Sequence, residues 1–189
     1  RQTDDLVDRD AFRASVSAIL NAKNIYILGV RSAAALANFM SYYLNFMFSN
    51  VHTVTSSGES EMFEKLVNVC AEDVVIAFSF PRYSALIAKG AKYCQKNGAT
   101  VIAFTDSKLS PLGQASDYAL LAKSDMVSLV DSLVAPMSVV NALLVALASE
   151  KEQALSKTFD ALELANEGKI IAVVPENSAE KIISVMKNF

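Results

Sequence analysis

Short apolar runs alternate along this chain with longer segments of helical pattern, and this alternation restricts the fold more than any other feature. Five short runs rich in apolar or β-branched residues stand at 25–28, 51–55, 74–78, 101–104 and 118–121. Runs that are apolar on both faces are typical of parallel strands covered by helices on both sides. We therefore predict an α/β fold, a three-layer α/β/α sandwich around a five-stranded parallel sheet with the flavodoxin-like strand order 2-1-3-4-5.

Helical patterns fill the spaces between the first four runs. We expect helices at 32–48, 59–69 and 84–97. Ser32 and Ser84 begin two of these segments and are expected to act as N-caps, because a hydroxyl oxygen accepts a hydrogen bond from a free N–H group of the first turn. Gly98 follows the third helix and suits the left-handed residue that commonly ends one.

The same pattern divides the chain into three parts. Residues 1–22 are expected to form an amphipathic lead-in helix, 23–150 the main domain, and 151–189 a C-terminal appendage of helix and strand. Because the chain begins at Arg1 without a methionine, we expect it to be part of a longer protein.

Beyond the fifth run the pattern becomes helical again from Ser124. The apolar segment 133–148 is interpreted either as a buried core helix or as part of a dimer interface. Pro136 is expected to kink that helix or to mark its start. In the appendage we expect a strand at 169–174 and a last helix at 177–187.

Composition excludes several classes of protein. Hydrophobic residues make up 52% of the 189 residues, which excludes a disordered chain. The net charge of -3 argues against direct binding of nucleic acid, because such domains are usually basic. Two cysteines without a CxxC pattern and a single histidine exclude a disulfide framework and an ordinary zinc site, and they fit a reducing cytoplasm. With no signal peptide and no apolar run of about 20 residues, we expect a cytoplasmic protein without a membrane span.

Hydroxyl and guanidinium groups gather directly after four of the predicted strands, at the edge where parallel sheets bind ligands. The candidate residues are Arg31, Ser32, Ser57, Glu59, Ser79, Arg82, Ser84 and Thr105. Hydroxyls, guanidinium groups and N–H groups at helix N-termini are the donors that a phosphate needs. Taken singly, the serines are more simply explained as caps or turn residues and the arginines as solvated cations. Their convergence on one edge predicts a site for an anionic small molecule.

The common nucleotide and catalytic motifs are missing from the sequence. Gly29 stands alone in the first loop, so there is no GxGxxG fingerprint, and no GxxxxGK[ST] loop occurs. His52 lies within the second run, where a structural role explains it better than a Ser-His-Asp triad. Glu59 is either a general base or a first-turn residue that favours the helix dipole.

Several of these segments together resemble the SIS (sugar isomerase) domain, and more narrowly the effector domain of RpiR/MurR-type transcriptional regulators. The resemblance covers roughly residues 10–150 and rests on the segments 29–32, 73–79, 91–92, 98–106, 110–112 and 115–117. In that family a helix-turn-helix domain precedes the SIS domain, and a phosphosugar alters the affinity of a dimer for DNA. The resemblance implies a phosphosugar-sensing homodimer or tetramer that contacts DNA only through a domain outside this chain, with residues 4–21 as the end of the connection to it.

The phosphate-binding loop of the family usually reads Ser-x-Ser-Gly-x-Thr/Ser, whereas residues 79–84 read Ser-Phe-Pro-Arg-Tyr-Ser. Ser79 and Ser84 keep the outer hydroxyls. Pro81 has no N–H group and Arg82 has a Cβ that restricts its backbone, so we expect weaker backbone donors. Our hypothesis is that the Arg82 guanidinium replaces them by a charge-assisted contact. The alternatives are a carboxylate ligand, a nucleotide ligand or no ligand.

Three polar residues near the start of the long helix complete the candidate site. Ser128, Asp131 and Ser132 are predicted either to approach the sugar, from the same or the partner subunit, or to form the polar edge of an interface helix.

The alternative function is that of a SIS-type aldose–ketose isomerase. Isomerisation needs a base near the C2 proton and usually a second acid or base for ring opening. The isomerases of the family often use a glutamate and a histidine; Glu59 can supply the base, but the usual late histidine is missing. We therefore predict a protein that is not an enzyme, with no catalytic residue, cofactor or metal.

Overall fold

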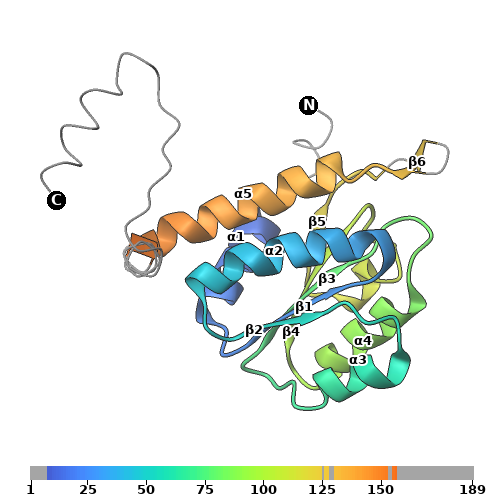
Figure 1. Cartoon of the computed structure of the whole chain (residues 1–189), viewed down its shortest axis with the longest axis horizontal. Helices are drawn as coiled ribbons and strands as arrows, with labels where there is room; N and C mark the ends of the chain where they lie inside the picture. The colour runs from blue at the N-terminus through green and yellow to red at the C-terminus, as the bar shows by residue number, and fades with distance from the viewer. Residues whose placement is uncertain (1–7, 125, 128–129, 153–154, 157–189) are drawn as a thin grey trace, which may run out of the picture. The chain divides into compact units, whose positions relative to one another are not determined.

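A computed structural model describes residues 8–124, 126–127, 130–152 and 155–156 (Figure 1). Its central sheet consists of β1 (Ile25–Gly29), β2 (Val51–Val54), β3 (Val74–Phe78), β4 (Thr100–Thr105) and β5 (Tyr118–Leu121). The strand order is β2-β1-β3-β4-β5, and each neighbouring pair is parallel. The predicted sheet and its order are confirmed.

Helices cover both faces of this sheet, which completes the three predicted layers (Figure 1). One layer contains α1 (Arg9–Asn21), α2 (Ala34–Met47) and α5 (Val134–Glu150), and the other contains α3 (Glu59–Leu66) and α4 (Ala85–Lys96). Within the layers α5 packs on α1 and α2, and α3 packs on α4. These elements belong to one compact unit that ends at Glu152.

The sheet builds a core on each face, because successive side chains of a strand point to opposite sides. Leu28 and Ala77 belong to the buried cluster that includes residues of α3 and α4. Phe78 and Phe104 lie in neighbouring strands on the other face, and their rings stack with centroids 4.7 Å apart. Each core is therefore formed by alternate residues of the same apolar runs.

Two of the three predicted helix ends are confirmed. Ser84 caps α4, since its hydroxyl oxygen accepts the N–H of Ile87 at 3.4 Å. Gly98 has a φ of 87°, the left-handed conformation expected after that helix. The prediction that Ser32 is an N-cap is wrong: it lies inside a 3-10 turn, η1 (Arg31–Ala33), and α2 begins after it without a side-chain cap. The tight turn leaves the Ser32 hydroxyl available for another acceptor.

The segment after Ser124 also differs from the prediction. Instead of a helix, β6 (Met126–Val127) and β7 (Val130–Asp131) form an antiparallel ribbon. Valine and aspartate are weak helix formers, which favours this outcome. Pro136 lies in the first turn of α5, where its missing N–H group is tolerated, so it marks the start of the helix.

The strand and helix expected at 169–174 and 177–187 lie outside the described residues. Among the residues that the structure describes, no helix is long and apolar enough to cross a membrane.

Candidate functional site

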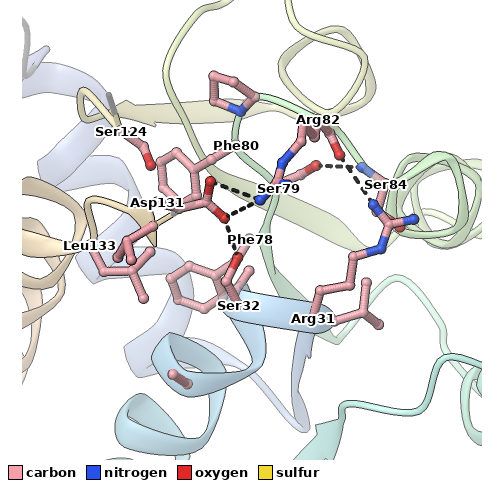
Figure 2. Close-up of a pocket in the computed structure, with 15 residues that line it drawn as sticks. Arg31, Ser32, Phe78, Ser79, Phe80, Arg82, Ser84, Ser124, Asp131 and Leu133 are labelled. Carbon is pink, nitrogen blue, oxygen red and sulfur yellow. Dashed lines mark hydrogen bonds and ion pairs between the residues drawn. The ribbon is translucent and has the colours of Figure 1, made fainter. Parts of the chain in front are cut away.

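A cavity of about 590 Å³ opens at the carboxyl ends of β1 and β3 (Figure 2). The chain leaves β1 for β2 on one side and returns with β3 on the other, so this is the switch point at which parallel sheets bind ligands. Its lining comes from three segments, residues 30–33 and 35, residues 78–82 and 84, and residues 124, 130, 131 and 133. The volume lies in the range of small-molecule sites.

Two arginines on this cavity have strained backbones. Arg31 has a φ of 56° and Arg82 a φ of 67°, and no other non-glycine residue in the described ranges has a positive φ. This conformation costs an L-residue about 1–2 kcal/mol, and such strain gathers at functional sites. Residue 82 stands where the SIS phosphate loop has glycine. We expected its Cβ to restrict the backbone, yet Arg82 adopts the conformation that favours glycine.

The loop after β3 presents two buried hydroxyls to the cavity. The Ser79 hydroxyl oxygen accepts the N–H of Ser84 at 3.2 Å, and the Ser84 hydroxyl in turn accepts the N–H of Ile87. Both oxygens use a lone pair in these bonds, so both O–H protons can be donated to an anion. The N-terminus of α4 lies directly behind them and favours negative charge.

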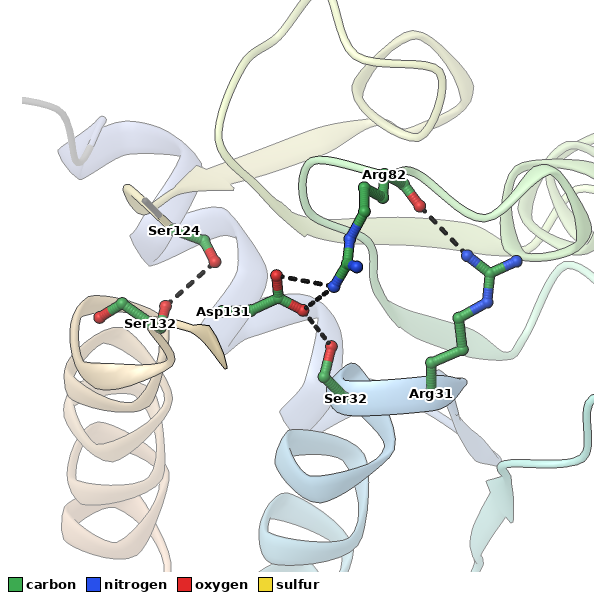
Figure 3. Close-up of polar contacts among 6 residues, drawn as sticks. All are labelled: Arg31, Ser32, Arg82, Ser124, Asp131 and Ser132. Atoms are coloured by element: carbon green, nitrogen blue, oxygen red, sulfur yellow. Dashed lines mark hydrogen bonds and ion pairs between the residues drawn. The ribbon is translucent and has the colours of Figure 1, made fainter. Parts of the chain in front are cut away.

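Asp131 brings a carboxylate into the same cavity (Figure 3). Its Oδ2 accepts the Ser32 hydroxyl at 2.9 Å, and the Arg82 Nη2 donates to Oδ1 at 3.0 Å and to Oδ2 at 2.9 Å. The Asp131 side chain is 15% exposed, whereas that of Arg82 is 60% exposed. Asp131 therefore joins the loop after β1 to the loop after β3.

The bridge keeps Asp131 ionised. The hydrogen bond from Ser32, and next the bond from Arg82, lower the pKa of Asp131 below its ordinary value. A lowered carboxylate pKa stabilises the folded state above the unfolded pKa, and that contribution is lost as the pH falls through the folded pKa. The carboxylate is therefore charged at neutral pH, and acid weakens the bridge by protonating it.

Two further contacts order the rim. The Arg31 Nη1 donates to the backbone oxygen of Arg82 at 3.3 Å, which holds the two strained loops together. The buried Ser124 hydroxyl donates to the backbone oxygen of Ser132 at 3.0 Å and ties the two ends of the ribbon together (Figure 3).

The structure brings together six of the eleven candidate residues, and Ser132 takes part only through the backbone oxygen that accepts from Ser124. Arg31, Ser32, Ser79, Arg82, Ser84 and Asp131 line the cavity. Ser128 lies outside the described residues. Sequence reasoning missed Ser124, although the signal was available: it follows β5, the one strand whose following loop was not considered.

Three candidates do not line this cavity. Thr105 is the last residue of β4 and is fully buried, and its hydroxyl shares a 2.8 Å hydrogen bond with Ser110. Glu59 begins α3 and forms an ion pair with Lys89 at 3.1 Å. Ser57 follows β2, the edge strand, one strand away from the switch point. These residues lie at the same edge of the sheet as the cavity, but not between β1 and β3, where the strand order reverses.

A switch-point cavity lined by serines and arginines is typical of α/β domains that bind small molecules. The sequence identifies the family: the model of the SIS domain matches residues 18–146. The chain belongs to the SIS domain family.

Curated proteins similar in sequence to this chain include two transcriptional regulators. The chain is 30% identical over 121 residues to an uncharacterised HTH-type transcriptional regulator of Haemophilus influenzae, an alignment that covers 64% of this chain and 41% of that protein. A similar regulator of Clostridium perfringens is 28% identical over 120 residues, covering 63% of this chain and 42% of that protein. The chain thus spans less than half the length of the curated relatives it matches.

Among solved structures, the sugar isomerase domain of the RpiR transcription factor from Sphaerobacter thermophilus has a TM-score of 0.81 and 27% identity, over 86% of this chain and 90% of that one. The Vibrio vulnificus NanR protein in complex with ManNAc-6P has a TM-score of 0.73 and 19% identity, over 85% of this chain and 63% of that one. Other structures of this fold are named as phosphosugar isomerases.

Proposed function

We propose that this chain is the effector-binding domain of an RpiR-type transcriptional regulator, which senses a phosphosugar and changes DNA binding by a helix-turn-helix domain outside this chain. The observation that carries the proposal is the switch-point cavity, lined by two arginines and four serines, in a SIS domain similar to those of regulators. Residues 1–22 would lead from the DNA-binding part, 23–150 would bind the effector, and 151–189 would follow as an appendage.

The donors in the cavity suit a phosphate monoester. Ser79 and Ser84 can donate their hydroxyl protons, and the N-terminus of α4 adds a partial positive charge. The planar guanidinium of Arg82, whose Nη2 donates to Asp131, can contact phosphate oxygens. Arg31 and Ser32 approach from the loop after β1.

The isomerase alternative has less support in the cavity. Asp131 is the one carboxylate among the described residues that line it, and no histidine is among them. An ion-paired carboxylate with a lowered pKa is a weak general base at neutral pH. Glu59, the base expected from sequence, is paired with Lys89 instead.

The test is thermal unfolding of the chain in the presence of phosphosugars, free sugars, nucleotides and simple anions. A ligand at about 100 times its dissociation constant stabilises the folded state by about 2.7 kcal/mol, which raises the midpoint by roughly 5–10 °C at this size. We expect one phosphosugar to give such a shift and its unphosphorylated sugar to give none. No shift with any phosphosugar would contradict the proposal, and turnover of the bound sugar would favour the isomerase.

We also propose that the chain forms a homodimer through α2 and α5, in the cytoplasm. The residues of α2 and those of α5 up to Ser149 include no charged side chain, although Tyr42, Tyr43, Val134 and Val145 are exposed. The helices α3 and α4, in contrast, carry charged residues throughout. Depletion of charge and enrichment in tyrosine are typical of interface cores, and an uncharged face is complementary to its own copy.

A matched pair of variants tests this interface. Light scattering after size exclusion is expected to give about twice the 20.4 kDa of one chain. Val145→Glu should yield monomers because it places a charge in the interface. Val67→Glu, at an equally exposed valine at the end of α3, should leave the dimer intact. A monomeric wild type would contradict the proposal.

A further inference from the structure

The Asp131 carboxylate lies among the groups that an anionic ligand would need. It accepts one hydrogen bond from Ser32 and two from the guanidinium of Arg82, all between 2.9 and 3.0 Å. It also lines the cavity itself rather than its outer rim (Figure 2). A carboxylate and a phosphate present the same kind of acceptor to a guanidinium fork. Asp131 therefore makes the contacts of a bound anion.

The charge of the cavity supports this interpretation. The lining residues include two cations, Arg31 and Arg82, and one anion, Asp131. A phosphate monoester carries close to two negative charges at neutral pH, which matches the two arginines without Asp131. With Asp131 in place the cations are half neutralised, and a second anion would meet a like charge beside Arg82. Asp131 occupies Nη2 of Arg82 and the Ser32 hydroxyl, so a phosphate that takes these same donors competes with the carboxylate.

We propose that Asp131 is an intramolecular competitor for the anion site, and that the effector's phosphate binds by displacing this carboxylate from Ser32 and Arg82. The inference rests on the proposed function, because it takes the effector to be an anion at this cavity. It adds a mechanism by which binding changes another part of the fold. Asp131 holds β7 to Ser32 and Arg82 until the phosphate replaces the carboxylate at these two residues.

The position of Asp131 in the chain connects the site to the proposed dimer face. Asp131 ends β7, and α5 begins three residues later at Val134. The bond from Ser124 to the Ser132 backbone lies between them. Release of Asp131 removes the contacts that hold this segment to Ser32 and Arg82 and leaves the Ser124–Ser132 bond as its tie next to α5, the helix whose uncharged face we assign to the partner subunit. A ligand shifts the equilibrium between the closed and the open Asp131 bridge only if it binds the two states with different affinity. Competition for Arg82 supplies that difference.

The experiment is a titration with inorganic phosphate, followed by the backbone amide NMR signals of the loops at 29–33 and 79–84. If the bridge is closed about ten times as often as it is open, it weakens the apparent affinity about tenfold. Asp131→Asn, which removes the charge, is expected to bind phosphate about tenfold more tightly than the wild type. Asp131→Ala should also raise the phosphate affinity, because it removes both the charge and the hydrogen bonds that asparagine can keep.

The matched control is Glu72→Gln. It removes the same charge from another ion pair, Lys23–Glu72 at 2.8 Å, at the amino edge of the sheet beside the start of β3. Its phosphate affinity should equal that of the wild type, which separates a local competitor from a change in net charge.

The outcomes distinguish this inference from the proposed function. If the wild type binds a phosphosugar but both Asp131 variants bind phosphate no more tightly, Asp131 is not a competitor and only this inference fails. If both variants bind more tightly than the wild type and Glu72→Gln does not, the inference holds. If neither the wild type nor the variants bind phosphate or any phosphosugar, the cavity is not an anion site and both proposals fail.

Discussion

Phe104→Ala is expected to lower the free energy of unfolding by about 3–5 kcal/mol, the usual cost of removing a buried aromatic side chain. Phe104 is 0% exposed and lies on the fourth of five parallel strands, where its ring stacks on Phe78. Its removal leaves a cavity between the sheet and the helices of the α1, α2 and α5 layer. Urea unfolding followed by circular dichroism measures the change.

The control for Phe104→Ala is an exposed hydrophobic residue. Leu109 is 81% exposed, so Leu109→Ala should change the free energy of unfolding by no more than about 0.5 kcal/mol. If Phe104→Ala lowers the free energy of unfolding by less than about 1 kcal/mol, the Phe104 ring is not tightly packed between the sheet and the helices. Because Phe78 lines the ligand cavity, Phe104→Ala should also weaken effector binding at temperatures where the variant is folded.

Arg82→Ala is expected to weaken phosphosugar binding by about 10- to 100-fold. A hydrogen bond to a charged group contributes about 1.5–3 kcal/mol, and the variant removes a guanidinium that can contact the phosphate. It also leaves Asp131 charged beside the anion, held by Ser32 without its cationic partner. Isothermal titration with the sugar found by thermal unfolding measures the loss.

Two further variants isolate the cause of that loss. Lys23→Ala removes a cation from the opposite edge of the sheet and should leave affinity unchanged. Arg82→Gly removes the same side chain but relieves the positive φ, so it should be about 1–2 kcal/mol more stable than Arg82→Ala and bind equally weakly. Tight binding by either variant of Arg82 would show that its guanidinium does not contact the ligand.

The sheet could be predicted almost in full from the sequence. The inner strands β1, β3 and β4 are apolar runs because both of their faces are buried, and Gly98 and Ser84 mark the ends of α4. The prediction of a helix from Ser124 was wrong. Local helix preference is weak in this segment, and pairing between β6 and β7 determines its structure instead. Ser32 was predicted to be an N-cap because the sequence alone does not show that a 3-10 turn precedes α2.

The site could be predicted only in part. The sequence placed hydroxyls and arginines at the carboxyl ends of the strands, since the end of an apolar run is a local feature. It did not distinguish the loops after β1 and β3, which meet at the strand-order reversal, from those carrying Ser57 and Thr105.

What the sequence determined by itself is the set of strands and the polar character of one edge, because hydrophobic periodicity depends on neighbouring residues, whereas the strand order was predicted by analogy with flavodoxin-like folds. What only the tertiary structure decided is the cavity and its contacts. Ser32 and Asp131 are 99 positions apart, and Arg82 and Asp131 are 49 apart. No local pattern encodes such contacts, because they form only when the folded sheet brings the loops after β1 and β3 and the ribbon beyond β5 to one point.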